Sequence, residues 1–341
     1  MSDRTELDEI GEFGLIERIT KAVELKQKDT VKGIGDDAAV IDRGDYYELI
    51  STDLLTENIH FDMSYTPLKH LGYKAIAVNV SDICAMNGTA THVTVSLAIS
   101  NRFSVEAVDE LYAGILLACE KFNVDLIGGD TTSSLSGLTI SVTAFGRVAK
   151  EKITYRSGAK DKDLICVSGD LGAAYIGLQL LEREKQIWKE NPDVQPDLEG
   201  NDYVLERILK PEARVDIVEL LEKEGIVPTS MMDISDGLGS EVLHLCKQSN
   251  CSARIYEDKL PIDATVSIQA KEFNMEPSTC AMNGGEDYEL LFTVKQEDFH
   301  KVNAMPEVKI IGYMEDDSQG ARLVFPQGEE VEIKAQGWKS F

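Results

Sequence analysis

The sequence lacks the features that mark membrane and secreted proteins. No apolar run approaches the roughly 20 residues of a membrane helix, and the start, MSDRTELDEIGEFG, has no basic stretch followed by an apolar one. No CxxC pair and no HExxH spacing occurs, although the chain has six cysteines and five histidines. We therefore expect a cytoplasmic protein with buried free thiols and without a histidine-rich zinc site.

Basic charge is also scarce. The chain has 34 lysines and arginines against 60 aspartates and glutamates, a net charge of -26. Such a field repels nucleic acid and anionic lipid, so neither is an expected partner. The GxxxxGK[ST] loop, a strand followed by GxGxxG, and the HRD and DFG pair are all absent. A standard P-loop protein, Rossmann protein or protein kinase is therefore excluded.

Length and apolar spacing predict two domains with a boundary near residue 150. At 341 residues and 43% hydrophobic, the chain is better suited to two cores than to one. Spacing in residues 1–150 predicts an N-terminal helix over 13–23, a helix capped by Thr66 and started by Pro67, and a helix from Ser104 to about residue 122. Short alternating strands lie between them, one of which should deliver Asp130 into a loop.

Residues 151–341 begin with a predicted strand, LICVSG, and a helix that starts in DLGAAYIGLQLLE. The polar segment 184–201 holds two prolines and is predicted to be a surface excursion, and Pro211 should end the next helix. The runs YELLFTV, VKIIGYM and RLVF resemble short strands. Strands and helices do not alternate regularly enough for a doubly wound sheet, so the expected fold class is α+β.

Six segments place acidic residues beside glycine or small residues at predicted strand or helix ends: GIGDDAAV, STDLL, NVSDICAMNG, GGDTT, MDISDGL and NGGEDYEL. Singly, each has a structural explanation; Asp233, for example, is an acceptable helix N-cap with Asp236 in the first turn. Together, short carboxylates suit Mg²⁺, which takes one or two protein carboxylates and completes its shell with water and substrate phosphates. The residues alone thus predict a Mg²⁺-dependent enzyme that handles phosphates.

In their order, these segments, with YRSGA and the GWKSF tail, resemble the thiamine-monophosphate kinase family, which belongs with aminoimidazole ribonucleotide synthetase and selenophosphate synthetase in one ATP-binding superfamily. The resemblance spans nearly the whole chain. It implies Mg²⁺-assisted direct transfer of the γ-phosphoryl group of ATP to thiamine monophosphate, which yields thiamine diphosphate. It also implies an aminoimidazole ribonucleotide synthetase-like fold, in which residues 1–150 bind ATP and metal and form a homodimer, and residues 151–341 form a C-terminal α+β domain.

The resemblance also assigns a site, without an obligatory catalytic side chain. It leaves open the number of Mg²⁺ ions and whether K⁺ takes part. The implied metal ligands are Asp36, Ser51, Thr52, Asp53, Asp82, Asp130, Asp233 and Asp236. The implied ATP contacts are Gly129, Asp130, Arg156 and Ser235, and the implied contacts to thiamine monophosphate are His60, Glu286 and Trp338. The tail departs from the family's usual ending at Lys339 and Ser340.

Two other functions are compatible with the residues. A sister activity in the superfamily would phosphorylate an amide oxygen before ring closure, but Trp338 favours a flat cationic ligand, on which an indole ring can stack. From a different class, the chain would be a non-catalytic protein that binds Ca²⁺ through Asp-Gly turns. The DxDxDG spacing of an EF-hand is absent, and calorimetry with Ca²⁺ and no nucleotide would separate that case.

Overall fold

The computed structural model describes residues 7–316 and 320–334, and its strands form two sheets. The first sheet has six strands in the order β1-β2-β3-β6-β4-β5. Only β4 and β5 pair in parallel; the other neighbours are antiparallel. The strands are β1 (Thr30–Lys32), β2 (Ala39–Asp42), β3 (Tyr47–Thr56), β4 (Thr89–Ile99), β5 (Asp125–Ser133) and β6 (Thr139–Val148).

The second sheet has seven strands in the order β13-β12-β9-β11-β7-β10-β8. Here only β12 and β9 run parallel. Two largely antiparallel sheets confirm the α+β class and exclude a doubly wound sheet. The strands are β7 (Leu164–Ser168), β8 (Ser230–Asp233), β9 (Ser252–Tyr256), β10 (Leu290–Val294), β11 (Val308–Glu315), β12 (Ala321–Val324) and β13 (Glu330–Glu332).

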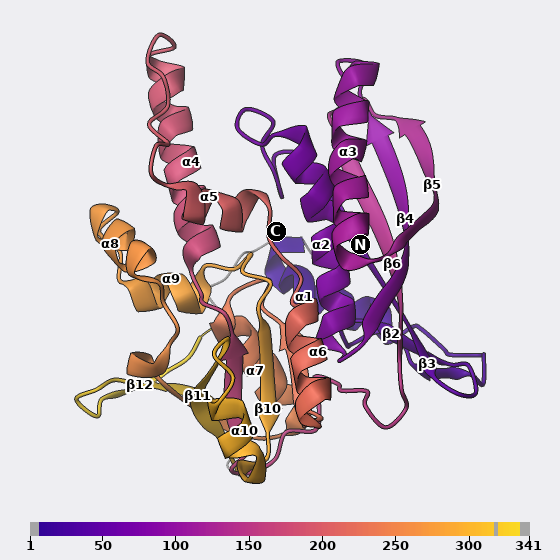
Figure 1. The fold of residues 1–341 in the computed structure, drawn as a ribbon, viewed down its shortest axis with the longest axis vertical. Coiled ribbons are helices and arrows are strands. Elements are labelled where there is room, and N and C mark those ends of the chain that lie inside the picture. Colours follow the sequence, from indigo (N-terminus) through magenta and orange to yellow (C-terminus); the bar gives the residue numbers. More distant parts are fainter. Residues whose placement is uncertain (1–6, 317–319, 335–341) are drawn as a thin grey trace, which may run out of the picture.

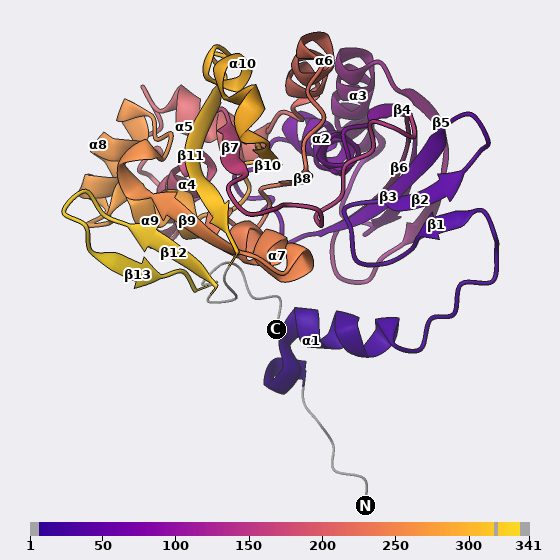
Figure 2. The same ribbon diagram turned by 90° about the horizontal axis from the view of Figure 1, so that it is seen from below.

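The helices are distributed between the two halves, and α1 lies apart from both sheets (Figure 2). No helix in the described part of the chain is long and apolar enough to cross a membrane. The first half contributes α1 (Leu7–Thr20), α2 (Leu68–Ala85) and α3 (Val105–Phe122). The second contributes α4 (Ala173–Glu190), α5 (Asp202–Leu209), α6 (Val215–Glu224), α7 (Leu238–Ser249), α8 (Ala264–Glu272), α9 (Pro277–Asn283) and α10 (Phe299–Asn303), with 3₁₀ turns at Glu257–Lys259 and Gln296–Asp298.

Helix α2 lies between the two sheets (Figure 1). It contacts β3, β4 and β6 on one side and β8, α5 and α6 on the other. Its residues 71–81 and 83–85 are buried, so a single apolar cluster continues from Ile76 to Phe292 of the second sheet. Gly72 and Gly114 permit the close crossing with α3, because a Cβ there would lie 2.0 or 1.9 Å from a backbone oxygen. Side chains on α2 can therefore reach both halves of the molecule.

Several boundaries confirm the sequence predictions. Ser104 caps α3 by accepting a hydrogen bond from the Ala107 N–H at 3.3 Å, and α3 ends at Phe122. Helix α5 ends at Leu209, before Pro211, because the residue preceding a proline disfavours helical geometry. The cysteines in the structure are free thiols, and all are buried except the half-buried Cys251.

Other boundaries correct the predictions. The N-terminal helix stops at Thr20 and not at residue 23. Pro67 is the N-cap of α2, with an extended ψ of 134°, so the helix starts one residue later than predicted. Helix α4 continues to Glu190, into the predicted excursion over 184–201, because EREKQ consists of good helix formers. Asp130 lies within β5 instead of in a following loop, since the pairing of β5 with β4 extends to Ser133.

The structural alternative for Asp233, that of a helix N-cap, does not hold. Asp233 is the last residue of β8 and pairs with Leu290 of β10. The N-cap of α7 is Gly237, whose φ of 120° suits glycine. The Asp233 carboxylate is therefore not used at a helix start.

Candidate active site

Three segments that are distant in the sequence bring carboxylates together. Asp37 precedes β2, Asp82 lies in the last turn of α2, and Asp233 ends β8. One ligand oxygen from each of these residues lies within 4.8 Å of the others. We call Asp37, Asp82 and Asp233 the carboxylate cluster. It joins both halves of the molecule through α2.

Neighbouring polar side chains on α2 and β3 orient the cluster. Ser81 Oγ donates a hydrogen bond to Asp233 Oδ2 at 2.5 Å, while Ser51 Oγ in β3 donates one to Asp82 Oδ2. Consecutive residues on a helix point about 100° apart, so Ser81 and Asp82 face different partners. Asn79 also bridges the two elements, because its Oδ1 accepts from the Asp53 N–H at 3.1 Å.

Burial and mutual repulsion raise the pKa values of these acids. Burial, and next the charge of Asp53, raises the pKa of Asp82 well above its ordinary value. Burial, and next Asp37, raises the pKa of Asp233 to about 7. Burial, and next Glu286, raises the pKa of Asp53 to about 6. Acids crowded in this way retain protons near neutral pH unless a cation compensates their charge. The all-oxygen donor set fits a hard divalent cation such as Mg²⁺.

Arg156 is a cation that the chain itself places beside the cluster. Its side chain donates to both oxygens of Asp37, at 2.6 and 3.1 Å, and its backbone N–H donates to Asp36 Oδ1 at 3.0 Å. Lys32 Nζ lies 3.4 Å from Asp36 Oδ2. The sequence prediction named Asp36 and Arg156 but missed Asp37. The adjacent acid in GIGDDAAV was the available signal, and only the folded turn shows that Asp37 belongs to the cluster.

A cavity of about 1060 Å³ includes Asp82 and Asp233 in its wall. Residues from both halves line it, including the first-half segment around residue 60 and the glycine-rich segment before β10. The structure thus brings half of the predicted site residues together in one wall. The predicted residues in this wall are Asp53, His60, Asp82, Asp233, Ser235, Asp236 and Glu286.

Backbone hydrogen bonds join the GGEDYE segment to the end of β8. The Glu286 N–H donates to Ser235 O at 2.7 Å, and the Tyr288 N–H donates to Ile234 O at 2.8 Å. Gly285 permits this approach, because a Cβ there would lie 2.6 Å from Ser235 O and its φ is +69°. The two acidic motifs DISDG and GGEDYE therefore form one wall.

Lys74 and His60 are two of the basic residues that line this cavity. Lys74 Nζ of α2 is 2.5 Å from Glu286 Oε2, and the lysine side chain is only 4% exposed. His60 Nδ1 accepts from the Thr56 N–H at 3.0 Å, so the neutral imidazole carries its proton on Nε2. Sequence reasoning missed Lys74, although a single lysine inside the apolar run HLGYKAIAV was a usable signal.

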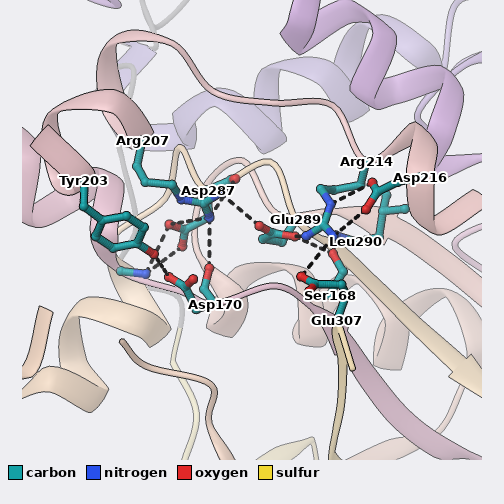
Figure 3. Close-up of polar contacts among 11 residues, drawn as sticks. Ser168, Asp170, Tyr203, Arg207, Arg214, Asp216, Asp287, Glu289, Leu290 and Glu307 are labelled. Carbon is teal, nitrogen blue, oxygen red and sulfur yellow. Dashed lines mark hydrogen bonds and ion pairs between the residues drawn. The ribbon is translucent and has the colours of Figure 1, made fainter. Parts of the chain in front are cut away.

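A second group of charged side chains surrounds Asp287 and Glu289 of the GGEDYE segment (Figure 3). Arg207 Nη1 lies 3.0 Å from Glu289 Oε1, Arg214 Nη1 donates to Glu289 Oε2, and Arg214 Nη2 lies 2.8 Å from Asp216 Oδ2. Glu289 thus bridges two guanidinium groups. We call this group the arginine network; it consists of Ser168, Asp170, Tyr203, Arg207, Arg214, Asp216, Asp287, Glu289 and Glu307.

Three predicted residues lie away from the carboxylate cluster. Thr52 points to the opposite face of β3 from Ser51 and Asp53, and its hydroxyl donates to Val142 O at 2.9 Å. Gly129 and Asp130 are exposed in the edge strand β5. Strands β6 and β4 separate β5 from β3, a distance of roughly 14 Å. Trp338 lies outside the described residues.

Comparisons with known proteins agree along the chain. The model of the AIR synthase related protein, N-terminal domain, matches residues 35–148, and that of the C-terminal domain matches residues 163–324. A thiamine-monophosphate kinase of Aquifex aeolicus is 36% identical over 98% of this chain and 99% of its own length. The Bacillus subtilis relative of the same name is 31% identical, covering 97% and 99%.

Comparisons with solved structures agree with the sequence comparisons. AaThiL complexed with AMPPCP and TMP is similar with a TM-score of 0.84 and 33% identity over 100% of both chains. A thiamine monophosphate kinase structure from Aquifex aeolicus is similar with a TM-score of 0.77 and 32% identity, over 96% of this chain and 100% of the other. The hydrogenase maturation protein HypE, in complex with HypF, shares the fold at 16% identity and a TM-score of 0.72.

Proposed function

The chain belongs to the thiamine-monophosphate kinase family, and we propose that it transfers the γ-phosphoryl group of ATP to thiamine monophosphate, yielding ADP and thiamine diphosphate. The observation that carries this proposal is the carboxylate cluster, with Asp82 and Asp233 in the wall of a cavity of about 1060 Å³ that both halves of the chain line. Two polyanionic substrates can meet there only if their charge is neutralised.

The acceptor needs little activation from the chain. A phosphate monoester has a second pKa near 6, so its oxygen is largely anionic at neutral pH and no side chain must remove a proton. We therefore assign no obligatory base or nucleophile. The contribution of the chain is to hold the acceptor and donor phosphates in line and to surround them with fixed charges.

Asp82 and Asp233, with Asp37 and Asp53 beside them, are the residues proposed to hold Mg²⁺. When bound, Mg²⁺ neutralises phosphate oxygens and orients them for in-line displacement. Ser51 and Ser81 keep the two central carboxylates in place through their hydroxyl groups. The further ligands proposed are Asp36, Ser51, Thr52, Asp130 and Asp236. Assays in potassium and sodium salts would decide whether K⁺ takes part.

The two substrates are proposed to use different walls. His60 and Glu286 hold thiamine monophosphate, and Trp338 is proposed to stack on its cationic ring. Lys74 fixes the Glu286 carboxylate, whose charge is opposite to that of the ring. ATP is assigned to Gly129, Asp130, Arg156 and Ser235, with the Arg156 fork beside the phosphates.

A homodimer accounts for the exposed position of Asp130. We propose that residues 1–150 form the dimerising domain and residues 151–341 the second domain. Leu54 and Ile127 of the first sheet are 56% and 58% exposed, an unusual position for large apolar side chains in strands. A second copy that covers β5 would let ATP contact both chains. Sedimentation velocity should therefore report a dimer, and Ile127→Glu should shift the equilibrium toward the monomer.

The reaction is assigned to the cytoplasm.

The proposal is tested by measuring ADP formation from Mg²⁺-ATP with and without thiamine monophosphate. Mass spectrometry identifies the product, and free thiamine serves as the control acceptor. We expect ADP and thiamine diphosphate to appear together, and only with the monophosphate. If neither forms while ATP still binds with Mg²⁺, the acceptor assignment is wrong.

A further inference from the structure

Residues 286 to 289 alternate between two environments. Glu286 and Tyr288 line the cavity, whereas Asp287 and Glu289 are each 1% exposed and belong to the arginine network (Figure 3). Glu286 and Tyr288 have φ values of 61° and 51°. This left-handed conformation is unfavourable for a bulky side chain and persists only where the surroundings impose it. The segment is therefore held in a strained shape that directs two side chains into the cavity.

Contacts with the arginine network hold residues 286–289 in this conformation. Arg207 contacts both residues of the segment that belong to the arginine network. Its Nη2 donates to the Asp287 backbone oxygen at 3.4 Å, and its Nη1 pairs with the Glu289 carboxylate at 3.0 Å. The Gly172 N–H donates to the Asp287 carboxylate at 3.0 Å, and Ser168 Oγ donates to Glu289 at 2.5 Å. These bonds fix the residues on both sides of Tyr288 along the chain.

The Tyr288 hydroxyl lacks a hydrogen-bond partner among the described residues. The residue is 8% exposed and lines the cavity beside several carboxylates. The carboxylates whose charges act on it are those of Glu286, Asp53, Asp233 and Asp82. A phenol in such surroundings keeps its proton and is a donor. Lys74, in contrast, is already paired with Glu286. An incoming phosphate is an acceptor that suits the uncommitted hydroxyl.

We propose that the Tyr288 hydroxyl donates a hydrogen bond to a substrate phosphate oxygen, and that Arg207 is the positioning residue that holds Tyr288 in reach. This inference rests on the proposed function, because it requires phosphates at the carboxylate cluster. The phosphate belongs either to the acceptor or to the nucleotide, and the two sources can be distinguished by binding.

The test compares Tyr288→Phe with wild type, with Tyr46→Phe as the matched control. Tyr46 is 41% exposed in the turn between β2 and β3 and is no part of the cavity wall. We expect Tyr288→Phe to lower kcat/KM by about 10- to 100-fold, the range for a hydrogen bond to a charged group. Tyr46→Phe should behave as wild type. Values for Tyr288→Phe within twofold of wild type in kcat, KM and both dissociation constants would overturn the inference.

Calorimetry supplies the dissociation constants without turnover. Weaker binding of thiamine monophosphate alone assigns the contact to the acceptor phosphate, and weaker binding of a non-hydrolysable ATP analogue with Mg²⁺ assigns it to the nucleotide. A fall confined to kcat assigns the contact to the transfer step. If wild type makes no thiamine diphosphate, the proposed function fails alone, because these two binding comparisons still decide whether Tyr288 contacts phosphate.

A double-mutant cycle tests the role of Arg207. Arg207→Lys keeps the charge but loses the planar fork, so we expect it to reduce kcat/KM in wild type and to have little further effect in Tyr288→Phe. The conservative variant limits damage to the fold. Equal melting temperatures of wild type and Tyr288→Phe would confirm that the Tyr288 change is local. Additive losses, or no loss from Arg207→Lys, would overturn the positioning role.

Discussion

The carboxylate cluster and the arginine network are both acid-rich and largely buried, yet their acids are compensated in different ways. In the network, Glu289 bridges Arg207 and Arg214. In the cluster, Arg156 binds Asp37, while the only side chains that donate to the Asp82 and Asp233 carboxylates within the described residues are those of serines. Glu289 therefore has its countercharge within the fold. For Asp82 and Asp233, the proposed countercharge is bound Mg²⁺.

This difference teaches where an acid is structural and where it is available for chemistry. Buried ions need partners, because their desolvation is costly. Where the fold provides arginines, removing one leaves an unpaired charge. Where it does not, removing an acid relieves repulsion, and the cost appears only in function. The same class of substitution should thus have opposite effects in the two regions.

The largest expected effect is that of Asp233→Asn on turnover. The amide keeps the shape but loses the charge that would hold Mg²⁺, so kcat should fall on the order of 10²- to 10³-fold, as when other fixed transition-state contacts are removed. Without Mg²⁺, the melting temperature should be equal to or above that of wild type, because repulsion is relieved. Asp109→Asn on the exposed surface of α3 is the control. Unchanged turnover at saturating Mg²⁺ would remove Asp233 from the site.

Arg214→Met should give the opposite pattern, with a loss of stability. The Arg214 side chain is 10% exposed, and its removal leaves Glu289 without one of its two arginine partners. Breaking a buried pair typically costs about 3 kcal/mol or more, which corresponds to a fall of several degrees in melting temperature. Thermal unfolding followed by circular dichroism measures this fall in melting temperature. A melting temperature equal to that of wild type would show that Glu289 does not need this pair.

The third prediction concerns pH. The pKa values of Asp53 and Asp233 are raised to about 6 and about 7 in the fold, whereas the unfolded values are about 3.9. Between pH about 4 and about 7, the folded state therefore binds more protons than the unfolded state. The contribution of these carboxylates to the free energy of unfolding falls as pH rises through this range. In EDTA, the difference in melting temperature between wild type and Asp233→Asn should grow in favour of the variant over this window.

Mg²⁺ should reverse that trend. Because it binds deprotonated carboxylates, the rise in melting temperature on adding Mg²⁺ should be larger at pH 8 than at pH 5.5. Asp233→Asn should lose most of this rise. A Mg²⁺ effect that is independent of pH would mean that the ion binds outside the cluster.

The smallest effect is expected for a partly exposed ion pair in the cavity wall. Lys185 Nζ lies 2.8 Å from Asp62 Oδ2, and the side chains are 15% and 18% exposed. Pairs that water can screen contribute about 1 kcal/mol or less, so Lys185→Gln should change the melting temperature by only about 2 °C. A loss as large as that of Arg214→Met would place this pair with the arginine network.

Much of the fold followed from local patterns. The cap at Ser104, the end of α5 before Pro211 and the alternating strands depend on neighbouring residues, so the sequence alone predicts them. Asp130 was placed wrongly, and the N-cap alternative for Asp233 failed, because strand pairing decided their positions, through β4 for Asp130 and β10 for Asp233. Such pairing partners lie far away in the chain.

The site was predictable as a set of motifs but not as a geometry. DISDG and GGEDYE were recognised separately, and only backbone bonds such as that from Glu286 to Ser235 show that they form one wall. Asp37 was missed because neighbouring acids look alike in a sequence. Lys74 and Tyr288 were missed because their importance comes from what surrounds them: a buried partner for the lysine and a strained backbone for the tyrosine.

The most direct test of the account is to locate the metal. Crystals grown with Mn²⁺ in place of Mg²⁺ and with a non-hydrolysable ATP analogue would reveal bound ions by anomalous scattering. The account predicts peaks beside Asp82 and Asp233 and none in the arginine network. A peak beside Asp287 and Glu289, or no peak at the carboxylate cluster, would contradict it.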